Sequence, residues 1–334
     1  MTKRFPLDRR LVAVTMAVAA AVLVLVWAGS FVPAPSGGDA ARAASSVETP
    51  AAAESPEAED LPYHSADQLR PVVTRDGREV TQLTHAAGVG DVYIDGDNTR
   101  YVVVEVLDDR IVVEEDGKEE MPDVSDALRA MELEESGRAR AGLLQRLAGQ
   151  VSGSRRVDVG IYHTHNDESY VPTSGVESKE YGDIHRVGRA LKEALEAKGY
   201  RVEWRDDSHL PHDGQAYLRS RRTAAELSRS VPATIIDVHR DAIPSAESYL
   251  AEVNGERMSQ VRLVVGRQNQ NREANLEYAK RIKAIADEKY PGLVKGIFHA
   301  RGNYNQDLGP KMILLEFGTH LTGLGDAEKS VRLM

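Results

Sequence analysis

The stretch VDVGIYHTHNDESY, residues 157–170, joins a short apolar run to a group of polar side chains. Its first six residues have the length and β-branched content of a buried strand. His163, His165 and Glu168 follow that strand directly. Histidine and carboxylate side chains at the carboxyl end of a strand are candidates for metal binding or acid–base chemistry, because ligand sites of open α/β sheets gather there.

Strand-like and helix-like segments alternate on both sides of this stretch. A helix with one apolar face is predicted after Asp183, which we expect to be its N-cap, and Gly199 ends it. The other predicted elements are helices near 213–229 and 272–289, strands at 200–204, 234–238 and 312–316, and a hairpin turn at VNGE (253–256) that leads to VRLVV (261–265). This alternation predicts an α/β fold, a sheet with helices on both faces.

The segment before residue 155 has a different pattern. YVVVEVLDDRIVVEEDG (101–117) is typical of a hairpin, and VYIDGDNTR (92–100) adds a strand and an Asp-Gly turn. We find no group of catalytic residue types here and interpret 63–125 as a small β-rich accessory domain. Residues 126–154, with Ser125 as N-cap, are interpreted as a helical connector. Residues 155–334 form the domain that holds the candidate site.

The N-terminal region predicts a membrane anchor and a tether. Residues 11–32 contain no charged residue and follow four basic ones, at positions 3, 4, 9 and 10. As a helix this run would rise about 33 Å, enough for the hydrocarbon core, with its N-terminus in the cytoplasm. A cleaved signal peptide is the alternative, although secretory apolar regions are usually shorter. Residues 33–62, rich in Ala, Pro, Ser and Glu, are predicted to be a disordered linker. Either interpretation places the catalytic domain outside the cytoplasm.

The composition limits the ligands that the protein could bind and the residue types that could hold a metal ion. The formal charge is −10 and no long basic block follows the N-terminus, so nucleic-acid binding has little support. The chain has no cysteine. Any zinc must therefore be held by histidine and carboxylate side chains, a ligand set more typical of catalytic than of structural zinc.

Three apolar runs each end in a residue suited to metal binding or proton transfer. His165 and Glu168 follow the first run at an H-x-x-E spacing, which puts both on one side of a helical turn or tight loop. His239 ends the strand at 234–238, and Glu316 ends the strand at 312–316. Two histidines and one glutamate leave a fourth tetrahedral position for water, whose pKa zinc lowers towards about 7. Glu316 is the predicted general base and then the acid that protonates the leaving nitrogen.

Several residues next to these candidate ligands have more than one possible role. His163 either orients a ligand or replaces His165 as the ligand. Arg240 either stabilises the oxyanion of the reaction or binds a substrate carboxylate, and a surface pair with Asp241 is the alternative. Asp237 is expected to face away from His239 and is left out of the predicted site.

The three blocks YHTHNDESY (162–170), DVHRDA (237–242) and YNQDLGPKMILLEFGTH (304–320) resemble, in this order, the motifs of the stage II sporulation protein P family. The resemblance covers residues 155–325. It implies a membrane-anchored cell-wall hydrolase similar to the zinc-dependent N-acetylmuramoyl-L-alanine amidases. The implied reaction cleaves the amide between N-acetylmuramic acid and the L-alanine of the stem peptide, with cleavage of peptide cross-links as a second activity. The implied setting is spore engulfment, with a lytic transglycosylase and a membrane protein as partners.

The resemblance also assigns residues. His165 and His239 match zinc-ligand positions, and Glu316 matches the catalytic carboxylate. The third ligand is Glu180 by its position in the wider amidase group, or Glu168 by the spacing that zinc carboxypeptidases share; we choose Glu168. Asn305, Gln306 and Asp307 match the family's NQDL stretch and are assigned to substrate binding or to support of the ligands. The terminal helix that the family usually carries is short here. A zinc carboxypeptidase of stem peptides and a non-catalytic wall-binding scaffold are the alternative functions.

Overall fold

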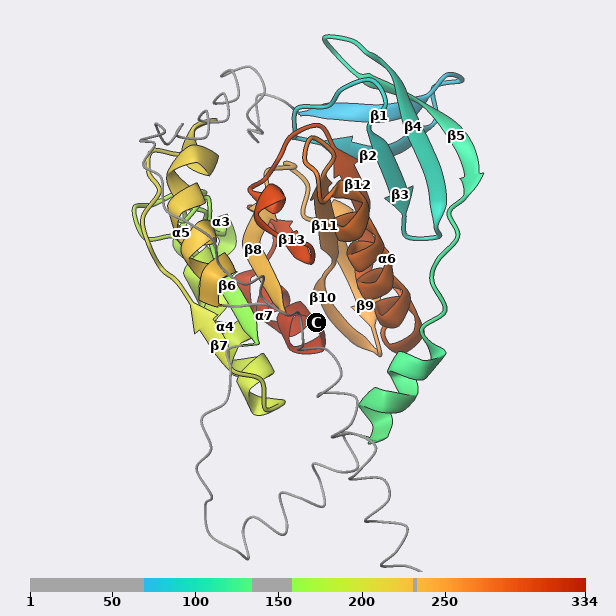
Figure 1. Ribbon diagram of the computed structural model, residues 1–334. Helices are drawn as coiled ribbons and strands as arrows, with labels where there is room; N and C mark the ends of the chain where they lie inside the picture. The colour runs from blue at the N-terminus through green and yellow to red at the C-terminus, as the bar shows by residue number, and fades with distance from the viewer. Residues whose placement is uncertain (1–68, 134–157, 231–232) are drawn as a thin grey trace, which may run out of the picture. The chain divides into compact units, whose positions relative to one another are not determined.

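The computed structural model describes residues 69–133, 158–230 and 233–334. In this part of the chain one mixed sheet has eleven strands in the order β2-β1-β5-β4-β3-β12-β11-β13-β8-β6-β7 (Figure 1). The strands are β1 (Arg70–Thr74), β2 (Glu79–Leu83), β3 (Val92–Asp95), β4 (Thr99–Val106), β5 (Ile111–Lys118), β6 (Val159–Tyr162), β7 (Val202–Trp204), β8 (Thr234–Asp241), β11 (Val261–Gly266), β12 (Val294–Ala300) and β13 (Met312–Thr319). The helices are α3 (Val171–Ser174), α4 (Ile184–Ala197), α5 (Ala216–Ser230), α6 (Arg272–Lys289) and α7 (Leu324–Leu333), with 3-10 turns η3 (Glu247–Tyr249) and η4 (Gln306–Leu308).

Helices cover both faces of the carboxyl-terminal half of the sheet, which is mixed α/β as predicted. Residues of α4, α6 and α7 pack in one core with Val238 and Leu263 of the sheet. On the opposite face α5 packs against β6 and β8. The strands β13, β8, β6 and β7 are mutually parallel, and all residues of β6 and β13 are buried. Strands covered on both faces have continuous apolar sequences, which is why β6 and β13 could be predicted from the sequence.

Two local predictions need correction. The turn at Asn254-Gly255 is present, and both residues have a positive φ, 53° and 78°. It joins β9 (Leu250–Val253) to β10 (Glu256–Ser259) in a separate two-stranded sheet, whereas VRLVV forms β11 of the main sheet. Asp183 does occupy the N-cap position of α4, but its carboxylate makes no cap bond and accepts hydrogen bonds from Tyr170 N and Ser174 Oγ instead.

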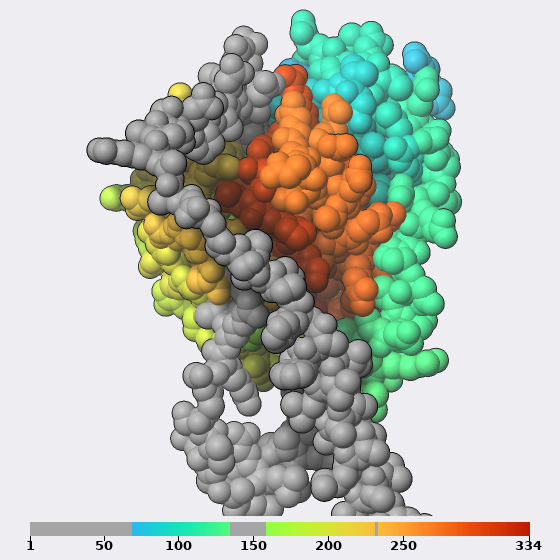
Figure 2. All heavy atoms as spheres, in the orientation of Figure 1, coloured from blue at the N-terminus to red at the C-terminus, as the bar shows by residue number. Residues whose placement is uncertain are grey.

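The strands between residues 70 and 118 continue the main sheet. Strand β3 pairs antiparallel with β12, Ile94 opposite Ile297. In Figure 2 the atoms of this segment (teal) lie directly against atoms of the carboxyl-terminal part of the chain (orange). The domain boundaries at 125 and 155 stay predictions, but hydrogen bonds of a single sheet run between the segments on either side of them.

Among the described residues, no helix combines the length and the apolar character needed to cross a membrane. The predicted anchor at 11–32, the linker at 33–62 and most of the connector at 126–154 lie outside the described residues; the connector is helical over 125–133.

A buried pair of histidines packs between β6 and α4. His163 follows Tyr162 of β6 and points towards the α4 face, where Gly188 leaves room for its ring. Its ring centroid lies 4.9 Å from that of His185 on α4. Burial lowers the pKa of His185 to about 4 and that of His163 to about 3, with the neighbouring imidazole as a further cause for His163. Both rings are therefore neutral at ordinary pH.

We expect His185 to make the fold acid-sensitive. Its pKa is about 6.5 when unfolded and about 4 when folded, so acid favours the unfolded chain. This contribution to stability is complete above about pH 6.5 and declines by about 1.4 kcal/mol per pH unit below it. Relative to His185→Leu, the wild type should lose about 2 kcal/mol of unfolding free energy between about pH 7 and pH 5. Denaturant titrations of both proteins measure this, and a difference that does not change with pH would contradict it.

Candidate metal centre

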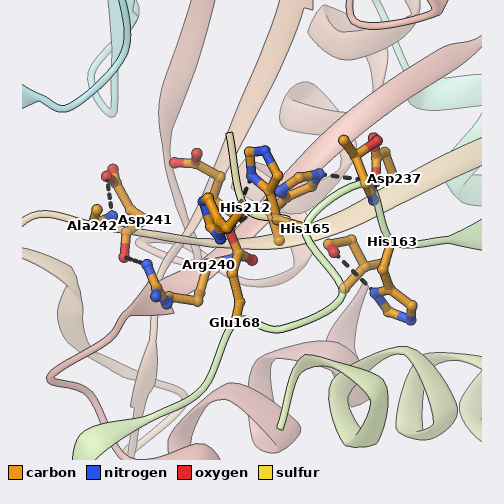
Figure 3. Close-up of polar contacts among 12 residues, drawn as sticks. His163, His165, Glu168, His212, Asp237, Arg240, Asp241 and Ala242 are labelled. Carbon is orange, nitrogen blue, oxygen red and sulfur yellow. Dashed lines mark hydrogen bonds and ion pairs between the residues drawn. The ribbon is translucent and has the colours of Figure 1, made fainter. Parts of the chain in front are cut away.

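The structure brings His165, Glu168 and His239 together beside the parallel strands β6 and β8. Figure 3 shows two of them, His165 and Glu168. Glu168 Oε1 lies 3.5 Å from His165 Nδ1 and 3.4 Å from His239 Nδ1. The two imidazole rings meet edge to face, with centroids 5.1 Å apart. All three side chains are buried. Segments about 70 residues apart thus bring two nitrogens and one oxygen within 4.8 Å of one another.

The spacing of these atoms fits a zinc ion. Ligand atoms about 2.1 Å from a tetrahedral zinc are about 3.4 Å from one another, because the tetrahedron's edge is about 1.6 times its radius. The two measured separations, 3.4 and 3.5 Å, match that value. Two imidazoles and one carboxylate are also the donor set of catalytic zinc sites, with a fourth position left over.

Further groups fix the orientation of these three side chains. His239 Nε2 lies 2.9 Å from Asp237 Oδ1, which leaves Nδ1 to face Glu168. Thr164 holds Asp237 in turn, through its backbone N–H at 2.8 Å and its hydroxyl at 2.6 Å. The expectation that Asp237 faces away is wrong, because residues two apart on a strand share a face. A carboxylate on the outer nitrogen of a histidine is the usual partner of a metal-bound imidazole.

The electrostatics of the site favour a positive charge. Burial alone would lower the pKa of His239, but Asp237 and Glu168 outweigh it and raise that pKa to about 10. Burial would likewise raise the pKa of Glu168, yet the charge of His239 and the hydrogen bonds of both imidazoles hold it well below its usual value. Two carboxylates on one imidazole thus favour a cation between them, either a proton or a metal ion.

Glu316 lies beside His239 on the neighbouring strand. The two residues are direct partners in the parallel pairing of β13 with β8, so their side chains leave the same face of the sheet. Glu316 is completely buried. Its Oε1 lies 2.8 Å from His85 Nε2, and its Oε2 accepts a hydrogen bond of 3.2 Å from the Tyr249 hydroxyl.

His163 is not part of this group of atoms. Its Nδ1–H donates to the Val238 carbonyl at 3.0 Å, and its Nε2 accepts from Trp204 Nε1–H at 3.1 Å. Tryptophan can only donate, so this tautomer is the one that satisfies both bonds. His163 therefore holds β6 to β8 and β7 from the opposite face, and both of its nitrogens are used in doing so.

Arg240 supports the site mainly through its backbone. Its N–H donates to Glu168 Oε2 at 2.9 Å, which fixes the carboxylate oxygen that does not face the imidazoles. Its guanidinium is directed at loop carbonyls, including Glu177 O at 2.8 Å. Its hydrogen bonds do not include the Asp241 carboxylate, which Arg262 holds instead, so the surface pair is not formed. The predicted contact of Arg240 with the oxyanion stays a prediction.

The three residues of the NQDL stretch hold the loop before β13. Asn305 Nδ2 donates to the Tyr217 carbonyl of α5. Gln306 bonds the backbone of β11 at both ends of its amide, Val264 O and Gly266 N. Asp307 makes a two-pronged pair with Arg221, at 2.8 and 2.6 Å. Their side chains are used within the fold, so a role in substrate binding stays a prediction.

Two further residues border the site. Glu180 is exposed and lies outside the group formed by His165, Glu168 and His239. It lines an open groove of 540 Å³ together with Asp167, Ser178, Lys179 and the segment 210–212. His212 of that segment stacks on His165 with ring centroids 4.0 Å apart, and its Nδ1 lies 2.9 Å from Asp167 Oδ1. His212 thus connects the groove with the candidate metal ligands, a role that no motif spacing indicates.

We expect Asp237→Asn to lower zinc affinity about 10- to 100-fold, the range for outer partners of metal ligands. Asp237 Oδ1 faces both His239 Nε2 and the Thr164 N–H, and Oδ2 accepts from the Thr164 hydroxyl. The amide of asparagine has no negative charge, so it holds the imidazole proton on Nε2 less strongly and makes Nδ1, the atom that faces Glu168, a weaker metal ligand. Competition with a chelating dye measures the affinity. Asp307→Asn, which removes a carboxylate held by Arg221, is the matched control, and equal affinities would contradict the assignment.

The fold and the site together place this chain among α/β proteins with a candidate metal centre beside the parallel strands of the sheet. The family model described as stage II sporulation protein P matches residues 78–334. The chain belongs to this family. It is 34% identical over 189 residues to the stage II sporulation protein P of Bacillus subtilis (strain 168), a match that covers 51% of this chain and 47% of that protein. The chain therefore spans about half the length of this curated relative.

Two solved structures show weaker likeness. One is the CwlD amidase from Clostridioides difficile in complex with the GerS lipoprotein, with 16% identity and a TM-score of 0.33 over 53% of this chain and 92% of that one. The other is the N-acetylmuramoyl-L-alanine amidase AmiC2 of Nostoc punctiforme, with 14% identity and a TM-score of 0.36 over 54% and 95%. At these values neither structure bears on what this chain does.

Proposed function

We propose that this protein is a zinc-dependent peptidoglycan hydrolase of sporulating cells that cleaves the amide between N-acetylmuramic acid and the L-alanine of the stem peptide. The observation that carries the proposal is the position of Glu168 Oε1, which lies 3.5 Å from His165 Nδ1 and 3.4 Å from His239 Nδ1, the separation expected between ligands of a tetrahedral zinc. Membership of the stage II sporulation protein P family supports the cell-wall setting. Attachment to the membrane through residues 11–32, and partners of the transglycosylase and membrane-protein kind, belong to the same proposal.

His165, Glu168 and His239 would hold the zinc. When bound, zinc supplies the Lewis acid that lowers the pKa of a water molecule and polarises the scissile carbonyl. Glu316, on the same face of the sheet as His239, accepts the proton of the attacking water and passes it to the leaving nitrogen. Asp237 and the backbone N–H of Arg240 keep two of the ligands in orientation. The groove beside His212 is the side from which we expect the wall fragment to approach.

The products of a wall digest test this proposal. Purified protein should contain about one zinc per chain, and chromatography with mass analysis should find intact stem peptides released from glycan. Detection of cleaved peptide cross-links would show an endopeptidase activity in addition to the amidase activity. Release of single terminal amino acids would instead identify a carboxypeptidase. Absence of metal, together with no effect of chelators, would identify a non-catalytic wall-binding protein and overturn the proposal.

A further inference from the structure

A histidine from the amino-terminal strands reaches the candidate catalytic glutamate. His85 follows β2 and is 231 residues away from Glu316 in sequence, yet its Nε2 lies 2.8 Å from Glu316 Oε1. The exposed fraction is 1% for the His85 side chain and 0% for that of Glu316, so water does not compete for this contact. A carboxylate only accepts hydrogen bonds, so His85 Nε2–H is the donor.

The residue before His85 makes a second contact of the same kind. Thr84 Oγ1 donates to Asp241 Oδ1 of β8 at 2.7 Å. Consecutive side chains after β2 thus bind carboxylates on β8 and β13, the two strands that carry His239 and Glu316. A segment that forms no part of the motif blocks is in this way held directly against the candidate site.

The other oxygen of Glu316 is also held. The Tyr249 hydroxyl lies 3.2 Å from Glu316 Oε2 and 2.8 Å from Asp241 Oδ2. The single proton of the Tyr249 hydroxyl is shared between these two oxygens, with the shorter contact to Asp241, so His85 is the principal donor to the Glu316 carboxylate. A long side chain with several rotatable bonds is otherwise poorly placed for proton transfer, and a displacement of about 1 Å costs about 10²-fold in rate.

His85, Asp241 and Glu316 are close enough to be considered as a second metal site, with ligand atoms within 4.8 Å of one another. The contacts favour a different interpretation. Arg262 is completely buried and its guanidinium lies 2.6 Å from Asp241 Oδ2, so a positive charge is already in place there. His85 and Glu316 bond each other directly, whereas ligands of one ion are held about 3 Å or more apart by it. Arg262 thus occupies the role that a second cation would have.

We propose that His85 is a positioning residue for Glu316, so that the segment 70–118 completes the active site instead of serving only as an accessory unit. The inference rests on the proposed hydrolase function. His85 Nε2–H donates to Oε1 and orients the carboxylate, whose other oxygen lies 3.2 Å from the Tyr249 hydroxyl. Glu316 then faces the water to be deprotonated in one orientation instead of several.

Kinetics on a soluble muropeptide with the full chain test this inference. His85→Ala should lower kcat about 10²-fold with KM within about twofold and with zinc content unchanged. His85→Gln retains an N–H near the position of Nε2 and should recover at least about tenfold of that loss, and added imidazole should partly restore His85→Ala. His299→Ala, which removes a half-buried histidine of β12 outside the candidate site, is the matched control and should have the wild-type kcat.

The possible results distinguish failure of this inference from failure of the hydrolase proposal. Wild-type kcat in His85→Ala would overturn the inference and leave the hydrolase proposal intact. Equal losses in His85→Ala and His85→Gln without imidazole rescue would mean that His85 only stabilises the fold, and would also overturn it. If His85→Ala does not fold, a kcat for the folded His85→Gln that is no higher than that of Glu316→Gln would overturn it. An inactive wild type with zinc bound would overturn the proposed function and the inference together.

Discussion

Replacing Glu316 with glutamine should lower the turnover of peptidoglycan about 10³-fold and leave zinc bound. Glutamine has nearly the same shape but does not accept a proton at neutral pH, and general acid–base catalysis contributes about 10² to 10⁴ in rate. Glu316 is not among the residues whose donor atoms converge at the candidate zinc position, so metal content should stay at the wild-type level. Dye release from labelled cell walls gives the activity, and elemental analysis gives the zinc.

A second variant distinguishes the effect of removing the base from the effect of displacing its carboxylate. Glu316→Asp keeps the charge but shortens the side chain by one methylene, which moves the carboxylate away from His85 and Tyr249. We expect an intermediate loss of about 10²-fold. Glu203→Gln on the outermost strand β7, half exposed, serves as the control and should have full activity. Full activity of Glu316→Gln would contradict the assignment of the base, and loss of zinc in it would show that Glu316 is a ligand.

Periodicity was sufficient to predict the strands that carry the candidate ligands. Strands β6, β8 and β13 are covered on both faces, and their apolar runs stand out from the amphipathic helices between them. Because β6, β8 and β13 are parallel, their carboxyl ends lie at the same edge of the sheet, and the convergence of His165, Glu168 and His239 could be anticipated from that. The separation of His163 from the site could not be predicted in this way, because residues 163 and 165 share a face by the period of two. The structure shows it through the packing of His163 against α4.

The contribution of the amino-terminal strands could not be predicted in this way. His85 stands alone in TQLTHAAGVG, with no second ligand-type residue at a metal-binding spacing. Its contact with Glu316 depends on the pairing of β3 with β12, which joins segments about 200 residues apart. Local patterns carry no information on such pairings. Asp237 is a different case, because the period of two along a strand is sufficient to place it beside His239.

Glu168→Gln should lower zinc affinity more than about 100-fold, beyond the range for partners that do not touch the metal. The carboxylate supplies one of three protein ligands, and its negative charge balances that of the cation between two imidazoles. Removing it leaves His165 and His239 without the oxygen that lies 3.5 and 3.4 Å from their Nδ1 atoms. Activity should fall with metal content and should recover in part when zinc is added in excess.

Glu180→Gln is the matched variant, because resemblance to the wider amidase group offers Glu180 as the alternative ligand. Glu180 is exposed on the rim of the groove, so this change should leave zinc affinity within about twofold of wild type. The reverse pattern, with zinc lost in Glu180→Gln and retained in Glu168→Gln, would require the loop at 166–182 to rearrange. That loop is held by Asp183, Arg240 and the backbone bond from Gly182 N to Asn166 O at 2.9 Å. Because rearrangement would break these contacts together, the two zinc affinities decide which carboxylate binds the metal.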